Sequence, residues 1–298
     1  MVNVYENVSE NKFKSTLTVG LFIGFITVAV YLISYSFNLD SSFLVIALIF
    51  SLTMSGATYF WGDKMVLALN GAKPAKREDY FDFYTVTQNL SMADQIPMPK
   101  IYVIDSPALN AFATGRDPHH AVVCATTGLL RKLNRSELEA VIAHELSHVK
   151  NFDTRLLMMV SLLIGSLSIL TNIAIQNSFF GGRRGRDSRG EGNLGAVMMI
   201  LGLLLAVFAP FIAKLIQLAV SRRREYLADA SGVKLTRQPQ SLIDALQKIS
   251  GDPNILSEAS PATASLYINN PFKGKSLSSL FSTHPPIEDR IRVLKNML

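Results

Sequence analysis

The 298-residue chain is 49% hydrophobic and 17% charged, and its formal net charge is +6. This balance, with a mean hydropathy of +0.26, predicts membrane segments joined to a water-soluble part of substantial size. Basic residues beside the membrane segments account for the net charge, so we expect no nucleic-acid partner. Cys124 is the only cysteine, which excludes an internal disulfide and is consistent with a reducing compartment for the soluble part.

The first membrane segments form a predicted N-terminal anchor of two transmembrane helices over residues 1–61. Residues 15–35 contain no charge, and at about 1.5 Å per residue they are long enough to cross a hydrocarbon core of about 30 Å. Residues 43–61 form a second such stretch. Between them, residues 36–42 carry no Lys or Arg, whereas basic residues flank the outer ends, so the N-terminus is predicted to be cytoplasmic. No small-residue cleavage site follows the first stretch, which favours an uncleaved signal anchor.

Residues 62–155 are predicted to form the first half of a soluble domain. A helix over 79–93 precedes two short strands at 100–105 and 121–126, with prolines between the helix and the first strand. These elements indicate a small sheet beside helices.

A helix with a metal-binding pattern closes this half, where residues 144–148 read His-Glu-Leu-Ser-His. Asn134 and Glu137 form a capping-box pattern, and apolar residues at helical spacing continue past the motif. Charged residues surround the motif and would be costly in hydrocarbon, which places the helix in the soluble part. Two surface histidines on an amphipathic helix are the alternative, but two of only five histidines fall in this spacing around a glutamate.

The residue types in this pattern suit a hydrolytic zinc site. His144 and His148 share one helical face and can reach one ion, while Glu145 lies about 100° further round, towards water on that ion. Zinc with three protein ligands lowers the pKa of its water to about 7, and a neighbouring carboxylate accepts the proton. Glu225 is the best third ligand, and Asp229 is placed to accept the second ring N–H of a ligating histidine. The alternative for both acidic residues is charge balance with the arginines that precede them.

Residues 156–220 contain two further apolar stretches, at 156–175 and 194–220. Ligands that precede and follow this region in the sequence must reach one ion. The chain must therefore cross the bilayer an even number of times between them. Four spans in all are predicted. The arginine-rich loop 176–193 would then face outward, contrary to the usual charge bias, so a re-entrant or interfacial hairpin is the alternative.

Residues 221–298 are predicted to supply the second half of the soluble domain. Helices are expected over 241–249 and 287–297, around a loop at 260–282 that is rich in Ser, Asn and Pro. Since each half would hold part of the zinc set, one composite domain folded from two segments is expected.

These features resemble the HtpX-type membrane zinc metalloproteases, relatives of the CAAX prenyl endopeptidases. The likeness covers nearly the full length, through four hydrophobic segments in the same order. It is carried by His144-Glu145-x-x-His148, Glu225-x-x-x-Asp229, Asn110-Ala111-Phe112-Ala113-Thr114-Gly115, and Thr283-His284-Pro285-Pro286 with Arg290. The resemblance implies a mainly α membrane protein: four hydrophobic helices plus a composite α+β zincin-like (gluzincin) metalloprotease domain with a small sheet.

The resemblance also implies an activity. His144, His148 and Glu225 would bind one zinc ion per chain and Glu145 would be the catalytic base of a zinc metalloendopeptidase (EC 3.4.24). Its partners would be the lipid bilayer and unfolded or membrane protein substrates, cut on the cytoplasmic side of the plasma membrane by a multi-pass protein in quality control and stress response. A membrane scaffold or transporter with a structural, four-ligand zinc is the alternative, although no fourth strong ligand is apparent near the motif.

Two weaker sites follow from the same resemblance. The segment 110–115 would lie near an edge strand that pairs with extended substrates through main-chain hydrogen bonds, which suits broad specificity. An ordinary turn into a core strand is the alternative. His284 or Arg290 would stabilise the tetrahedral oxyanion, although His284, before two prolines, would equally cap the last helix.

Overall fold

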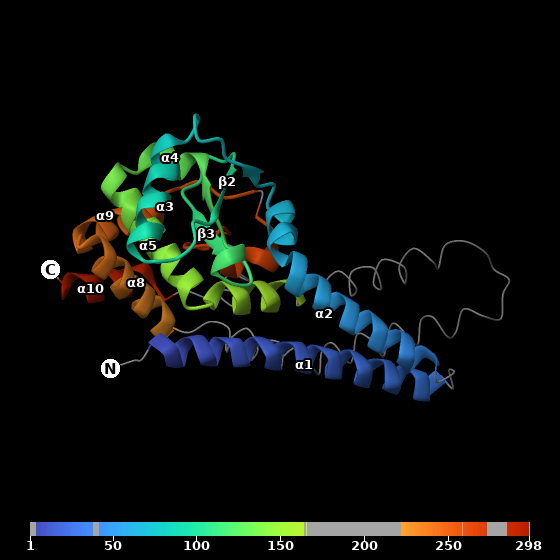
Figure 1. The fold of residues 1–298 in the computed structure, drawn as a ribbon. Helices are drawn as coiled ribbons and strands as arrows, with labels where there is room; N and C mark the ends of the chain where they lie inside the picture. The colour runs from blue at the N-terminus through green and yellow to red at the C-terminus, as the bar shows by residue number, and fades with distance from the viewer. Residues whose placement is uncertain are drawn as a thin grey trace.

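The computed structural model describes residues 4–37, 42–163, 165, 222–257, 259–272 and 285–297. Most of the third predicted membrane segment, all of the fourth, the arginine-rich loop and His284 lie outside the described residues. Within them the protein is mostly helical, with one small sheet, as expected (Figure 1).

Two long helices precede the soluble part and extend away from it side by side (Figure 1). Helix α1 spans Val4–Phe37 and helix α2 spans Ser42–Leu69, so each predicted N-terminal span falls within one helix. Among the described residues, one stretch, Leu44–Leu69, meets the length and composition for crossing a membrane, with a hydropathy of 1.7. Large apolar side chains on it are exposed, Ile46, Ile49 and Phe50 among them, which suits a lipid-facing surface.

The sheet has four strands in the order β1-β2-β4-β3. They are β1 (Lys73–Pro74), β2 (Lys100–Ile104), β3 (Ala111–Thr114) and β4 (Val122–Thr126). The two predicted strands, β2 and β4, are confirmed and pair in parallel, whereas β1 and β3 pair antiparallel to them. Every residue of β4 is buried, and β3 forms one edge of the sheet. Around the sheet lie α3 (Phe81–Ala93), the 3-10 turn η1 (Pro118–His120) and α4 (Thr127–Lys132).

Helix α5 (Arg135–Lys150) lies at the centre of the soluble part, against α3, α8 (Arg222–Thr236) and α9 (Pro239–Gly251). Its predicted capping box is confirmed: Asn134 Oδ1 accepts from the Glu137 N–H at 2.9 Å, and Glu137 Oε2 accepts from the Asn134 N–H at 2.8 Å. Both motif histidines are buried, which excludes the alternative of surface histidines on an amphipathic helix.

The C-terminal residues complete the same core. The 3-10 helix η2 (Pro261–Leu266) packs against β3, and α10 (Ile287–Lys295) packs against α8 and α9. Predicted helices over 241–249 and 287–297 are therefore confirmed within one residue or two of their bounds. One apolar cluster joins side chains that precede residues 156–220, such as Val141, to side chains that follow them, such as Leu246.

Candidate metal centre

Three potential metal ligands meet between helices α5 and α8. The ligand atoms of His144, His148 and Glu225 lie within 4.8 Å of one another, and all three residues are buried. Close approach of the two helices brings them together. A Cβ on Gly232 of α8 would lie 3.2 Å from the backbone nitrogen of His144, so the glycine lets α8 lie directly on α5. The structure thus brings together the three residues that the sequence offered as ligands: His144 and His148 from one face of α5, and Glu225 from α8.

The distances within this group fit a tetrahedral ion. Nε2 of His144 and Nε2 of His148 are 3.2 Å apart. Two Zn–N bonds of about 2.0–2.1 Å at a tetrahedral angle would separate their nitrogens by about 3.3–3.4 Å. Glu225 Oε1 lies 3.6 Å from His148 Nε2, and Oε2 lies 3.7 Å from His144 Nε2. The imidazole and carboxylate donors also match the ligand set that zinc accepts, so the residues present fit the metal.

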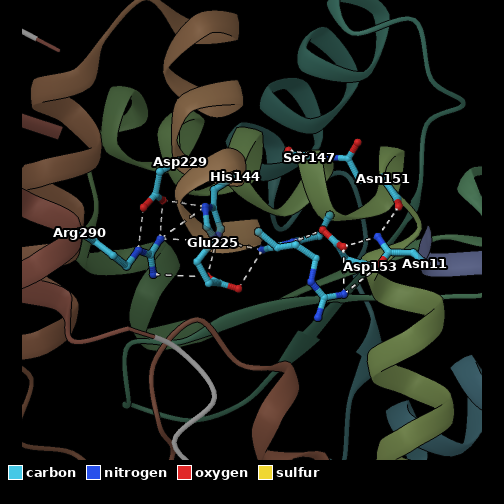
Figure 2. A network of polar contacts seen from close by, with 10 residues as sticks. Asn11, His144, Ser147, Asn151, Asp153, Glu225, Asp229 and Arg290 are labelled. Atoms are coloured by element: carbon cyan, nitrogen blue, oxygen red, sulfur yellow. Dashed lines mark hydrogen bonds and ion pairs between the residues drawn. The ribbon is translucent and has the colours of Figure 1, made fainter. Parts of the chain in front are cut away.

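A carboxylate and a guanidinium orient the first histidine (Figure 2). His144 Nδ1 lies 2.9 Å from Asp229 Oδ1, and Arg290 donates to Asp229 from Nε at 2.9 Å and from Nη2 at 2.6 Å. Burial raises the pKa of Asp229, but Arg290 and His144 lower it to about 2, so the carboxylate is ionised and accepts the Nδ1 proton. His144 is thereby held in the tautomer whose Nε2 lone pair faces the group.

The second histidine is oriented by a residue that the sequence did not single out. His148 Nδ1 lies 2.9 Å from Asp153 Oδ2, and Asp153 is buried. Burial lowers the pKa of His148, but the carboxylates of Glu225 and Asp153 raise it to about 9. One sequence signal could have identified Asp153: it lies at the start of an apolar stretch, where an unpaired carboxylate would be costly. Asn151 caps α5 and Phe152 adopts φ 60°, and this turn brings Asp153 back to the histidine.

Glu145 directly follows His144 on α5. The residue is buried, and its negative charge contributes to raising the pKa of both His148 and Arg290.

Arg290 is fully buried, and its guanidinium lies beside two carboxylates of the site. Nε and Nη2 are engaged by Asp229, and Nη1 lies 4.0 Å from Glu225 Oε2. Burial lowers the pKa of Arg290, but Asp229, Glu225 and Glu145 raise it above its usual value, so the guanidinium balances the carboxylates of the site. The oxyanion role of Arg290 stays a prediction, and the same role for His284 falls outside the described residues.

The predicted substrate segment, 110–115, contains the edge strand β3. Part of its outer edge is covered by the chain itself: Ile268 N–H donates to the Ala111 carbonyl at 3.0 Å, and Asn110 Nδ2 donates to the Asn269 carbonyl at 2.8 Å. Because main-chain groups alternate along a strand, Ala113 presents its N–H and C=O to the same outer side as Ala111. At the far end, the Gly115 carbonyl accepts from Thr154 Oγ1 at 3.0 Å.

Comparisons with known proteins identify the family of this chain. Residues 82–298 match the model of peptidase family M48. A protease HtpX homolog of Streptococcus equi subsp. equi is 45% identical over 269 residues, covering 90% of this chain and 89% of the relative. A protease HtpX homolog of Ligilactobacillus salivarius is 41% identical over 297 residues, covering 99% and 100%. The crystal structure of S. mikatae Ste24p matches with 21% identity and a TM-score of 0.48, over 96% of this chain and 66% of that one.

The expected resemblance is thereby confirmed. The chain belongs to peptidase family M48, among its HtpX-type membrane metalloproteases.

Proposed function

We propose that this chain is a zinc endopeptidase that hydrolyses misfolded or damaged membrane proteins on the cytoplasmic side of the membrane, in protein quality control and the stress response. The single observation that carries the hydrolytic part is the buried convergence of His144, His148 and Glu225. Both imidazoles turn Nε2 inward because Asp229 and Asp153 hold their Nδ1 atoms. A site with three protein ligands leaves a position for water, as hydrolytic zinc sites do.

Each residue then has a distinct chemical task. When bound by His144, His148 and Glu225, zinc would lower the pKa of a water molecule and polarise the peptide carbonyl. Glu145 takes the water proton as general base and returns it to the nitrogen of the departing amine. Asp229 and Asp153 hold the Nδ1 atoms of the two imidazoles and so keep Nε2 of each ring turned towards the other ligands. No covalent intermediate with a protein side chain is required.

The edge of β3 is the proposed platform for substrate. Ala113 offers one outward N–H and one outward C=O between the Ile268 contact at one end and the Thr154 contact at the other. An extended segment that pairs there is held by its main chain, whatever its side chains. This mode of binding suits a protease that accepts many unfolded sequences.

Contacts near the base of the two long helices support a cytoplasmic active site. Arg155 lies over the rings of Tyr59 and Phe152. Lys12 of helix α1 also lies over the Phe152 ring. Arg116 lies over Tyr59 and Phe60. Aromatic residues gather at membrane interfaces, and basic residues gather on the cytoplasmic side. This belt of arginine, lysine and aromatic side chains is therefore consistent with a soluble part that lies against the inner membrane surface.

Cleavage of an unfolded model protein by the detergent-purified chain tests the proposal. We expect cleavage with zinc, loss of cleavage with a chelator, and recovery when zinc is returned. Glu145→Gln, which removes the proposed general base, is the variant to compare with the wild-type chain. Glu139→Gln is its matched control, because Glu139 is a partly exposed glutamate on the same helix that pairs with Arg135. Zinc binding without cleavage by the wild-type chain under any condition would contradict the proposal and indicate a structural metal.

A further inference from the structure

Asn11 is a buried polar residue on the N-terminal helix α1, four positions before the predicted membrane span. Only 2% of its surface is exposed. Its amide reaches out of α1 to residues more than a hundred positions away in the chain, at the C-terminal end of α5 and at the start of α8. These partners matter for stability, because burying an amide without hydrogen-bond partners is costly.

The amide of Asn11 is fully used in this cluster (Figure 2). Nδ2 donates to Asp153 Oδ1 at 2.7 Å and to the Asn151 carbonyl at 2.9 Å. Oδ1 accepts from Arg224 Nη1 at 3.0 Å, and the same Nη1 lies 3.3 Å from Asp153 Oδ1. Asn11 therefore joins the turn after α5 to the residue that directly precedes Glu225.

The two oxygens of Asp153 have separate partners. Oδ2 accepts from His148 Nδ1, whereas Oδ1 accepts from Asn11 and Arg224. The Asn11 side chain must donate to a carboxylate and accept from a guanidinium at once, which an amide does and an apolar side chain does not. Because Asn11 and Arg224 hold Oδ1, the other oxygen of Asp153, Oδ2, stays directed at His148 Nδ1.

We propose that Asn11 is a positioning residue of the metal centre, so that the N-terminal membrane helix completes the zinc site through Asp153 and His148. This inference rests on the proposed function, since it takes His148 and Glu225 as ligands. It assigns α1 a role beyond anchoring: the helix that contains the first predicted membrane span also holds the carboxylate behind one ligand and the arginine beside another.

Zinc affinity of the full-length, detergent-purified chain tests the inference, measured by competition with a chromogenic chelator. Loss of a partner behind a metal ligand weakens metal binding by about 10–100-fold. We expect Asn11→Leu to weaken zinc affinity by about tenfold or more, and Asn11→Ala to change it in the same direction. Ser15→Ala is the matched control: Ser15 is also buried on α1, one turn further on, but its hydroxyl donates only to the Asn11 carbonyl of its own helix.

Two further readouts separate positioning from a merely structural role. At limiting zinc the Asn11 variants should lose cleavage, and excess zinc should restore kcat with KM for the substrate unchanged. In Asp153→Asn the additional effect of Asn11→Leu on zinc affinity should shrink, because both changes act through one carboxylate.

An Asn11→Leu chain that unfolds at a lower temperature without metal, yet binds zinc as tightly as wild type, would overturn the inference. Should Asn11→Leu fail to fold, Asn11→Ala decides by the same measurement. Failure of the proposed function looks different, because the wild-type chain would then itself bind no zinc or cleave nothing.

Discussion

At the scale of single residues, neighbouring positions on α5 carry different tasks. In the proposed mechanism His144 binds zinc through its Nε2 lone pair, and Glu145 takes the proton from water. We expect His144→Ala to lose zinc and cleavage together. Glu145→Gln should keep zinc, because the amide leaves the ligands untouched, and should reduce turnover by about 10²–10⁴-fold, the usual contribution of a general base.

Metal content by atomic absorption and turnover on the same preparations check both variants. If Glu145→Gln still cleaves at the wild-type rate, the general base lies elsewhere.

Arg290 offers a second test at this scale, because its charge is fully buried against Asp229. Removing one partner of a buried ion pair leaves the other charge uncompensated, which costs about 3–5 kcal/mol. We expect Arg290→Met to destabilise the soluble part by about that amount in urea unfolding without metal.

Arg292→Met is the matched control, since Arg292 lies on the same helix in an exposed pair with Asp289. Exposed pairs contribute about 0–1 kcal/mol, so this variant should unfold nearly as wild type does. Equal effects of the two substitutions would show that the buried pair does not hold the site together.

At the scale of elements, the contact between α5 and α8 brings Glu225 to the two histidines. Helix propensity favours Ala over Gly by about 1 kcal/mol, so Gly232 is retained for packing. Its added Cβ would meet the backbone at His144 N and Ala143 C, at 3.2 and 3.4 Å. We expect Gly232→Val to push α8 off α5, carry Glu225 away from the histidines, and weaken zinc affinity by about tenfold or more.

The control for this change is Gly251→Ala, at the end of α9, where a Cβ meets nothing within 4 Å. Zinc affinity should stay at the wild-type value in that variant. Unchanged affinity in Gly232→Val would contradict the role given to the close helix contact.

Periodicity and capping predicted helices α3, α5, α9 and α10 and the two inner strands, because those signals are local. The capping box at Asn134 and the four-residue histidine spacing needed no tertiary information. Strand β3 came only from a family resemblance, since its four residues carry no alternation: all of Ala111–Thr114 are buried. Asp153 was missed because its partner, His148, is reached by a turn in which Phe152 adopts a positive φ, and no local pattern signals that turn.

At the scale of the whole molecule, the N-terminal helix and the metal centre are linked by contacts that span the sequence. Asn11 and Asp153 are 142 positions apart, and Asn11 and Arg224 are 213 apart. A single sequence does not reveal such pairings. A second link has the same character: Asn70 Oδ1, at the end of α2, accepts from Thr263 Oγ1 at 2.8 Å and from Tyr267 OH at 3.0 Å.

The orientation of this assembly in the membrane can be tested with single cysteines. Burial raises the pKa of the Cys124 thiol and leaves none of its surface exposed, so the native residue should not react with a maleimide. It therefore need not be removed. A cysteine replacing exposed His119 reports on the soluble part, and a cysteine replacing Asp40 reports on the stretch of sequence between the two predicted N-terminal spans.

With a membrane-impermeant maleimide on intact cells, we expect labelling of the Asp40→Cys chain and protection of the His119→Cys chain until the membrane is opened. The reason is the distribution of basic residues, which favours a cytoplasmic N-terminus and a cytoplasmic soluble part. The opposite pattern would place the metal centre outside the cell. It would leave the zinc chemistry intact but exclude the proposed cytoplasmic substrates, since a protease cuts only what reaches its side of the membrane.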